Sequence, residues 1–292
     1  MLTLGARLES WRAFDGGLGR IGTSGQPVTN DYAARSDTAF DPKVSIEWHG
    51  GATSVQLSLA EATRFPTVGE LFQGSLNGDG SFNRDSFDPN LKPERSRDAN
   101  LVVAHDFGRL KLTGSAFWQR VEDTIFAFAG FNQNGVTTSS FKNIDLTRQY
   151  GLELIAEARD VGLRGLDIDA NAAWIDSKTI RNASAPAAEG VQFPRIPRWR
   201  LNANVRYQVT PRLLASLGLR YATRPNTDLF GLQRGDTFGY TSELFALDAK
   251  VNWKMTDRFR LSAGVDNITN DRAWVYHPYP QRSFLVEAGW TL

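Results

Sequence analysis

Apolar and polar residues alternate one by one through most of this sequence. The clearest case is WRLNANVRY (residues 199–207), where aromatic and aliphatic residues hold the odd positions and arginine or asparagine the even ones. Because successive side chains of a β-strand point to opposite faces, such a segment predicts a strand with one apolar and one polar face. Repetition of this pattern from end to end predicts an all-β fold.

Roughly twelve segments show the pattern. The first begins at the second residue, so the chain is expected to open inside a strand. No linker interrupts the series, and residues 1–292 are therefore expected to form a single unit. The apolar sets run through residues 2–8, 44–48, 55–59, 101–107, 110–118, 150–156, 166–174, 199–207, 213–221, 245–253, 259–265 and 284–292.

The connections between these segments are alternately short and long. The short ones are HGGAT, DFGR, RDVGLRG, QVTPR and KMTDR, and the long ones cover residues 15–37, 63–95, 127–141, 178–197, 225–242 and 271–281. This order predicts an antiparallel up-and-down meander with two unlike ends. Outer-membrane β-barrels have this organisation, with short periplasmic turns and long extracellular loops.

The apolar face of the strands is interpreted as facing lipid. Aromatic residues lie near strand ends, as in the interfacial girdles of membrane barrels. The opposite face carries charges such as Glu153, Asp169 and Arg206, which would be costly to bury unpaired in a protein core. The expected fold is therefore a transmembrane β-barrel. The alternative is a soluble β-sandwich with one solvated face.

Composition excludes several function classes. The 33 basic and 32 acidic side chains nearly cancel, which argues against a nucleic-acid partner. There is no cysteine, and the three histidines, His49, His105 and His277, lie on separate segments. Neither a protein metal site nor a cofactor is expected, because metal sites need several converging ligands. No base lies beside an obvious nucleophile, so no catalytic residue is proposed.

Two loop motifs resemble those of the TonB-dependent outer-membrane receptors. EATRFPTVGELFQG (61–74) is followed by DPNLKPERS (88–96), and the family has a strand that enters such an Arg-Phe-Pro…Glu-Leu-Phe loop and returns through Asn-Pro-x-Leu-Lys-Pro-Glu-x-Ser. YGLELIAEA is similar to the Gly-x-Glu strand of that family. GVDNITNDRAW and the closing RSFLVEAGWTL are similar to its last two strands.

The resemblance implies a larger assembly than this sequence provides. Family members have a barrel of about 22 strands around a plug domain, so these strands are expected to be the C-terminal portion of a barrel, without plug or signal peptide. The implied role is energised uptake of a scarce extracellular ligand, most commonly a ferric siderophore, with outer-membrane lipid around the barrel and the TonB complex reached only through a plug. The alternative is a self-contained barrel of about twelve strands acting as a channel or hydrolase.

Ligand-binding candidates come from the long loops, where an extracellular ligand first arrives. An arginine could meet anionic donor oxygens, and aromatic rings could stack on planar groups. Other loop arginines, Arg84, Arg195, Arg224, Arg234 and Arg272, could act in the same way. The predicted ligand-binding residues are Arg64, Phe72, Phe82, Trp274, Tyr276 and His277.

Overall fold

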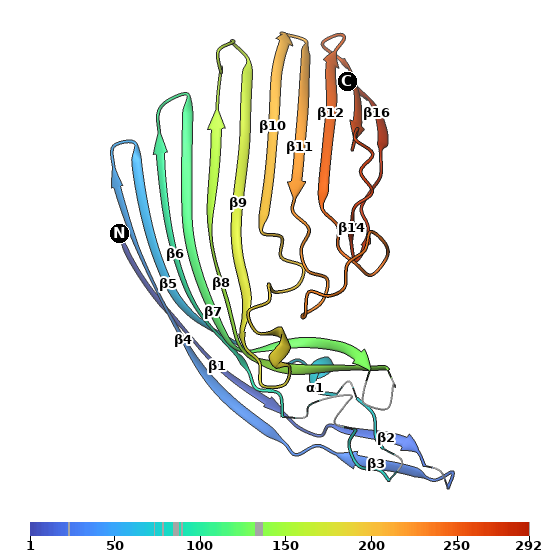
Figure 1. Ribbon diagram of the computed structural model, residues 1–292. Helices are drawn as coiled ribbons and strands as arrows, with labels where there is room; N and C mark the ends of the chain where they lie inside the picture. The colour runs from blue at the N-terminus through green and yellow to red at the C-terminus, as the bar shows by residue number, and fades with distance from the viewer. Residues whose placement is uncertain are drawn as a thin grey trace.

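A single curved antiparallel sheet makes up most of the molecule (Figure 1). The computed structural model describes residues 1–22, 24–72, 74–77, 79–83, 88, 90–131 and 137–291. In these residues twelve strands pair in the order β1-β4-β5-β6-β7-β8-β9-β10-β11-β12-β13-β16. The strands are β1 (Leu2–Ala13), β4 (Arg35–Gly50), β5 (Thr53–Arg64), β6 (Glu94–Asp106), β7 (Leu110–Phe131), β8 (Thr137–Ala158), β9 (Leu166–Arg181), β10 (Trp199–Thr210), β11 (Leu213–Ala222), β12 (Leu244–Lys254), β13 (Phe259–Asp266) and β16 (Ser283–Trp290).

The two ends of the sheet differ as the sequence predicts. Tight hairpin turns lie at one end, and the long connections gather at the other (Figure 1). Twelve strands and a meander topology are therefore confirmed, while Leu292, expected in the last strand, lies outside the described residues. The long connections contain β2 (Gly17–Ile21), β3 (Pro27–Asp31), α1 (Val68–Phe72), a 3-10 turn η1 (Pro186–Ala188), β14 (Trp274–Val275) and β15 (His277–Pro278).

One predicted loop is wrong. Residues 127–141 were expected to form a loop, but β7 and β8 remain paired as far as Phe131 and Thr137. The hairpin bends where Asp123 has a φ of 54° and is absent from the pairing register. Beyond this bend it crosses the long-loop end as an arm (Figure 1). The sequence pattern does not reveal this arm, because strands were predicted from the alternation of apolar and polar residues. An element that extends beyond the wall of the sheet does not need one wholly apolar and one polar face.

The apolar sets face outward from the sheet, with no second sheet packed on them in the described part of the chain. Leu201, Val205 and Leu261 would be buried in a sandwich, yet all three are only partly covered. Leu154 is 50% exposed. The soluble-sandwich alternative is therefore wrong, and the outward face matches the lipid-facing surface of a membrane barrel.

Aromatic residues mark two levels on this outward face. On several strands two of them lie eight positions apart, which corresponds to about 26 Å along a strand. An apolar band of about 25 Å flanked by aromatic girdles is typical of outer-membrane barrels. The pairs are Phe40 and Trp48 in β4, Trp199 and Tyr207 in β10, and Phe245 and Trp253 in β12.

The inward face pairs its charges across neighbouring strands. Arg159 and Arg206 both donate to Asp169, at 2.7 and 2.8 Å. Arg220 donates to Asp248 at 2.7 Å. These ion pairs let the inward face carry many charged side chains, because a charge with a partner costs less than an unpaired one.

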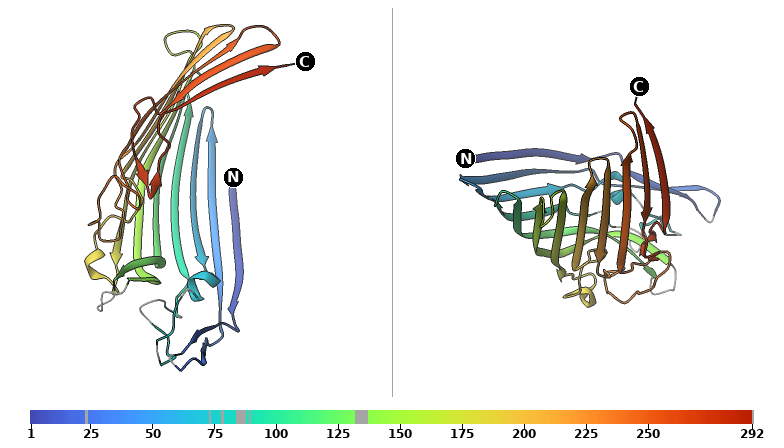
Figure 2. Two further views of the ribbon diagram at one scale, coloured as in Figure 1. Left: turned by 90° about the vertical axis from the view of Figure 1, so that its right-hand side faces the viewer. Right: turned by 90° about the horizontal axis from the view of Figure 1, so that it is seen from above.

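The sheet is part of a barrel wall and is not closed. The strand order has β1 and β16 at its two ends, and no pairing joins them in the described residues. Figure 2 shows the sheet curving from one edge to the other.

None of the helical segments in the described part of the chain is long and apolar enough to span a bilayer.

Candidate functional site

The six residues predicted from the sequence all lie at the long-loop end, but in separate places. Arg64, Phe72 and Phe82 belong to the connection between β5 and β6. The other three, Trp274 to His277, belong to the connection between β13 and β16. Among the described residues, no hydrogen bond, ion pair or ring contact joins the first group to the second. The site therefore has to be built from each group by itself.

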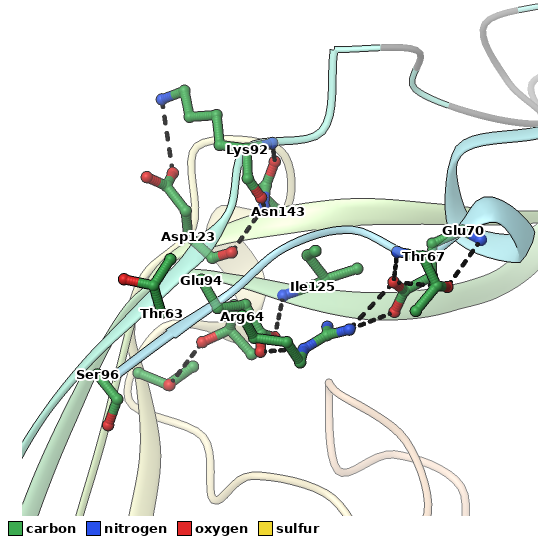
Figure 3. Close-up of polar contacts among 12 residues, drawn as sticks. Thr63, Arg64, Thr67, Glu70, Lys92, Glu94, Ser96, Asp123, Ile125 and Asn143 are labelled. Atoms are coloured by element: carbon green, nitrogen blue, oxygen red, sulfur yellow. Dashed lines mark hydrogen bonds and ion pairs between the residues drawn. The ribbon is translucent and has the colours of Figure 1, made fainter. Parts of the chain in front are cut away.

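Arg64 is the centre of an ion-pair network (Figure 3). Its Nη1 lies 2.9 Å from Glu70 Oε1, and its Nε donates to Glu94 Oε2. Glu70 also accepts a hydrogen bond from the backbone N–H of Thr67 at 2.8 Å, which completes the capping box that begins α1. Arg64 thus fastens the helix of its own loop to the start of β6.

The returning half of the motif fastens the arm of β7 and β8 (Figure 3). Glu94 accepts from the Ile125 N–H at 2.6 Å. The Asn143 amide exchanges two hydrogen bonds with the backbone of Lys92, at 2.8 and 3.0 Å, and donates to the Asp123 carbonyl at 2.6 Å. The bend at Asp123 is therefore held by the loop motif. We name the network of Arg64, Glu70, Glu94, Asp123 and Asn143 the loop latch.

A small apolar cluster lies beneath the loop latch. Leu71, Leu91 and Ile125 are buried, and Trp11 and Phe72 pack against them. Burial of these side chains stabilises the loop conformation, while the ion pairs fix its orientation. Both halves of the family-like motif therefore have a structural role in this protein.

The loop latch gives the first prediction. Arg64→Ala leaves the Glu70 and Glu94 carboxylates, 13% and 17% exposed, without their cation. A partly buried group that loses its partner costs about 1–3 kcal/mol, and the 43% exposure of Arg64 puts the loss at the lower end because solvent screens the pairs. We expect faster proteolytic cleavage in residues 63–95. The control is Arg234→Ala, because this exposed loop arginine has no ion pair among the described residues.

Acid is expected to weaken the loop latch in the same assay. Burial alone would raise the pKa of Glu70, but hydrogen bonds from Thr67 and Arg64 outweigh burial and lower it. A carboxylate with a lowered folded-state pKa stabilises above its unfolded pKa of about 4.3 and loses this contribution as pH falls through the folded value. Cleavage should therefore be slow at pH 7 and faster below about pH 4. Equal cleavage of the wild type and Arg64→Ala at pH 7 would contradict the role of Arg64.

Phe72 and Phe82 both contact the ring of Tyr32. The Phe72 ring meets Tyr32 edge-on with centroids 4.7 Å apart, and Phe82 stacks on Tyr32 at 4.7 Å. A Cβ atom at Gly16 would come within 2.3 Å of the Phe72 ring, so a larger residue here would require that ring to move. Burial raises the pKa of Tyr32 to about 12 and keeps it neutral. Phe72 is half-buried in this packing and presents little free ring surface.

Tyr276 and His277 belong to a more accessible group of rings. β14 and β15 form a tight hairpin, and Tyr276 at its tip has a φ of 67°. Its ring is 5.5 Å from Phe238 and 5.3 Å from His277, and the Arg195 guanidinium lies 5.1 Å above it. Tyr276 remains 41% exposed. We name Arg195, Phe238, Tyr276 and His277 the loop aromatic cluster.

Three separate connections build the loop aromatic cluster. Arg195 precedes β10, Phe238 precedes β12, and Tyr276 precedes β16. Backbone hydrogen bonds from Gly239 to Tyr276 (2.8 Å) and from Tyr276 to Tyr240 (2.9 Å) join two of them. Phe238 was not predicted from the sequence, because only the folded loops bring it next to the hairpin. Trp274 is half-buried at the base of the hairpin.

The other loop arginines have varied surroundings. Arg224 forms an ion pair with Asp236 at 2.8 Å. Arg234 and Arg272 are exposed, and Arg84 lies outside the described residues. The described residues contain no cluster of three metal-ligating side chains. The loop aromatic cluster, a cation and three rings on one accessible surface, can therefore bind a planar or anionic ligand but has too few ligands for a bare metal ion.

Comparison with known proteins places the chain in a family. The family model described as "TonB dependent receptor-like, beta-barrel" matches residues 1–268. Among solved structures, the copper transporter OprC aligns with a TM-score of 0.74 and 20% identity, over 99% of this chain and 45% of that one. A search of curated proteins gives no match.

Two further receptors of known structure also share the fold. The ferric-catecholate import receptor Fiu from E. coli K12, in its closed form, aligns with a TM-score of 0.70 and 19% identity over 99% of this chain and 42% of that one. The siderophore receptor PiuA from Acinetobacter baumannii aligns with a TM-score of 0.65 and 18% identity, over 99% of this chain and 39% of that one. The chain thus spans less than half the length of these structures.

Proposed function

Because the chain belongs to the TonB-dependent receptor family through its β-barrel, we propose that it forms part of the wall of an outer-membrane receptor that takes up a scarce extracellular ligand. The observation that carries this proposal is the open sheet of twelve strands, apolar outside and polar inside, with accessible loops at one end. The remaining wall and a plug would come from other strands and another domain. Contact with the TonB complex would be made through that plug.

The ligand is proposed to be an iron chelate such as a ferric siderophore. A ferric catecholate is anionic and has planar rings, so a guanidinium beside several aromatic side chains is a complementary surface. The loop aromatic cluster has this composition. The backbone of Tyr276 supports a binding role further, since strained non-glycine residues are frequent in ligand-binding segments. Among the similar solved structures, Fiu is named as a ferric-catecholate import receptor, PiuA as a siderophore receptor and OprC as a copper transporter.

Binding of a ferric tris-catecholate complex tests this proposal. Tyr276→Asn combined with His277→Ala should weaken binding at least tenfold, because it removes two of the three rings and Asn tolerates the left-handed backbone. Binding is measured by quenching of protein fluorescence in outer membranes from cells that produce the protein from its intact gene.

The matched control is Phe230→Ala. Phe230 is another exposed loop phenylalanine, with no ring contact among the described residues. The Phe230→Ala variant should bind the ferric tris-catecholate complex with the affinity of the wild type. Wild-type affinity in the double variant at normal protein levels would show that this cluster is not the ligand site.

A further inference from the structure

Four cations lie in register across four adjacent strands. Arg97 of β6 pairs with Arg120 of β7, Arg120 pairs with Arg148 of β8, and Arg148 pairs with Lys178 of β9. The row lies on the outward face, because side chains two or four positions apart on a strand share a face. Arg120 is two positions from the outward-facing Trp118 on β7, and Lys178 is four positions from the outward-facing Trp174 on β9. The row lies at the long-loop side of these aromatic residues. We name these four residues the outer cation row.

This arrangement is unfavourable without an anion. Like charges directly opposite each other on neighbouring strands destabilise a sheet. Three members of the row have a carboxylate partner, since Arg97 pairs with Glu61 at 3.0 Å, Arg120 with Glu122 at 3.1 Å and Lys178 with Asp176 at 3.4 Å. Among the described residues, the guanidinium of Arg148 has no ion pair and lies 5.1 Å from the ring of Tyr150. Its buried Nε has no hydrogen-bond partner among the described residues, and the same holds for the Nε of Arg120.

A pocket opens beside the outer cation row. Pairing between β4 and β5 ends at Lys43 and Ala60. Beyond that point a pocket of about 160 Å³ is lined by three arginines, Arg95, Arg97 and Arg120, and by three carboxylates, Asp41, Glu61 and Glu122. Arg7 already pairs with Asp41, Arg97 with Glu61 and Arg120 with Glu122. Arg95 adds another cation that has no ion pair among the described residues. The pocket is thus a polar recess with several guanidinium donors, the groups that bind phosphate oxygens bidentately.

Two apolar grooves lie on the outward face, and the first of them adjoins this recess through Phe40, Glu61 and Arg97. One groove of about 700 Å³ is lined by Leu4, Val44, Leu59 and Trp118, with Arg97 at its rim. A second of about 700 Å³ is lined by Leu101, Leu152, Leu154, Trp174 and Trp199. Their lining is almost wholly carbon, so they accommodate hydrocarbon chains.

We propose that the outer cation row and its recess bind the phosphorylated headgroup of an outer-leaflet glycolipid of the lipid A type, whose acyl chains lie in the two grooves. The inference rests on the proposed placement of the sheet in an outer membrane. There the long-loop end faces the outer leaflet, which puts the row at headgroup depth, just beyond the aromatic girdle. Phosphates then add negative charge beside Arg148 and Arg95, which have no ion pair among the described residues, and supplement the carboxylates that pair with the other three members of the row.

A lipid fits this surface better than a transported ligand. The row faces away from the inward side of the sheet, so a solute inside the barrel cannot reach it. A free anion would satisfy the guanidinium groups but would make no contact with the apolar groove beside them. The combination of phosphate donors and apolar grooves therefore selects a phosphorylated, multiply acylated molecule.

The test compares two triple variants of the protein produced from its intact gene and extracted from outer membranes. Arg97→Gln, Arg120→Gln and Arg148→Gln together neutralise most of the row. Lys111→Gln, Lys250→Gln and Arg260→Gln remove three inward-facing cations that have no ion pair among the described residues. Binding is measured with nanodiscs that contain lipid A, dephosphorylated lipid A, or neither. The row variant should bind lipid A at least tenfold more weakly, and the inward variant should match the wild type.

A second measurement uses the wild type alone and does not depend on variants that fold. Its melting temperature should rise with lipid A, and it should not rise with dephosphorylated lipid A or with inorganic phosphate. Equal rises with lipid A and its dephosphorylated form would overturn the proposal. An equal rise with inorganic phosphate would also overturn it and indicate a free-anion site. Binding of the ferric tris-catecholate in the same preparations reports on the proposed function separately, because the loop aromatic cluster shares no residue with the row.

Discussion

Replacing Leu154 with arginine is expected to lower the free energy of unfolding in a lipid bilayer by about 2–4 kcal/mol. Leu154 is 50% exposed on the outward face and lies midway between Tyr150 and Ala158 on β8, near the centre of the apolar band. A guanidinium there has neither water nor a counter-charge, because the cross-strand neighbours of Leu154 are Gly114 and Ala172. Transfer of the charge from water into hydrocarbon accounts for the loss.

The next residue along the strand supplies the control. Ile155 is 45% exposed, on the inward face, opposite Thr113 and Asn171. Ile155→Arg adds the same charge at the same depth, but to a polar, hydrated surface, so we expect a loss below about 1 kcal/mol. Both variants are refolded into lipid vesicles and unfolded with urea. Equal losses, or a larger loss for Ile155→Arg, would show that the two faces are assigned the wrong way round.

The strands could be predicted because the bilayer imposes a strong pattern on them. A lipid-facing position accepts few polar groups and an inward position accepts many, so apolar character alternates with a period of two. In β10, from Trp199 to Tyr207, every residue follows this rule. The order of tight and long connections then determined the topology, because a tight turn can only join antiparallel neighbours.

The arm of β7 and β8 could not be predicted in this way. Beyond Asp123 the hairpin leaves the wall of the sheet. The alternation of apolar and polar residues there no longer depends on which face contacts lipid. Its stability comes from the loop latch and from Ile125 beneath it, contacts between segments far apart in the sequence. The Glu94 carboxylate, for example, meets the Ile125 N–H 31 positions away.

The candidate site was predicted in part. Tyr276 and His277 were proposed because rings and prolines are concentrated in one loop, and the structure places both in an accessible cluster. Phe238 is visible only after folding. Arg64, in contrast, is easily found in the sequence, but its role is not. A loop motif alone does not show whether a residue contacts a ligand or stabilises the loop. Its two carboxylate partners give it a structural role, while its role toward a ligand stays a prediction.

The largest expected effect concerns the two free edges of the sheet. Alone in a bilayer, the 292-residue chain should fail to give a stable monomer, because β1 and β16 each leave a row of backbone N–H and C=O groups unpaired. Each such group costs several kcal/mol in hydrocarbon. We expect the edges to pair with other strands, either those that complete the wall or those of a second copy. The alternative is closure of the twelve strands into a small barrel.

Cross-linking distinguishes these outcomes cleanly, because the chain contains no native cysteine. Thr3→Cys in β1 and Glu287→Cys in β16 both lie on the inward face of an edge strand. A closed twelve-stranded barrel would bring the two edges side by side, so a short thiol cross-linker would join them within one chain. An open sheet keeps them apart and gives cross-links only between chains, which appear as covalent dimers of the double-cysteine variant or in a mixture of the two single-cysteine variants. A protease-resistant, heat-modifiable monomer with an intrachain cross-link would refute the open-edge proposal, since only closure satisfies both edges without a partner.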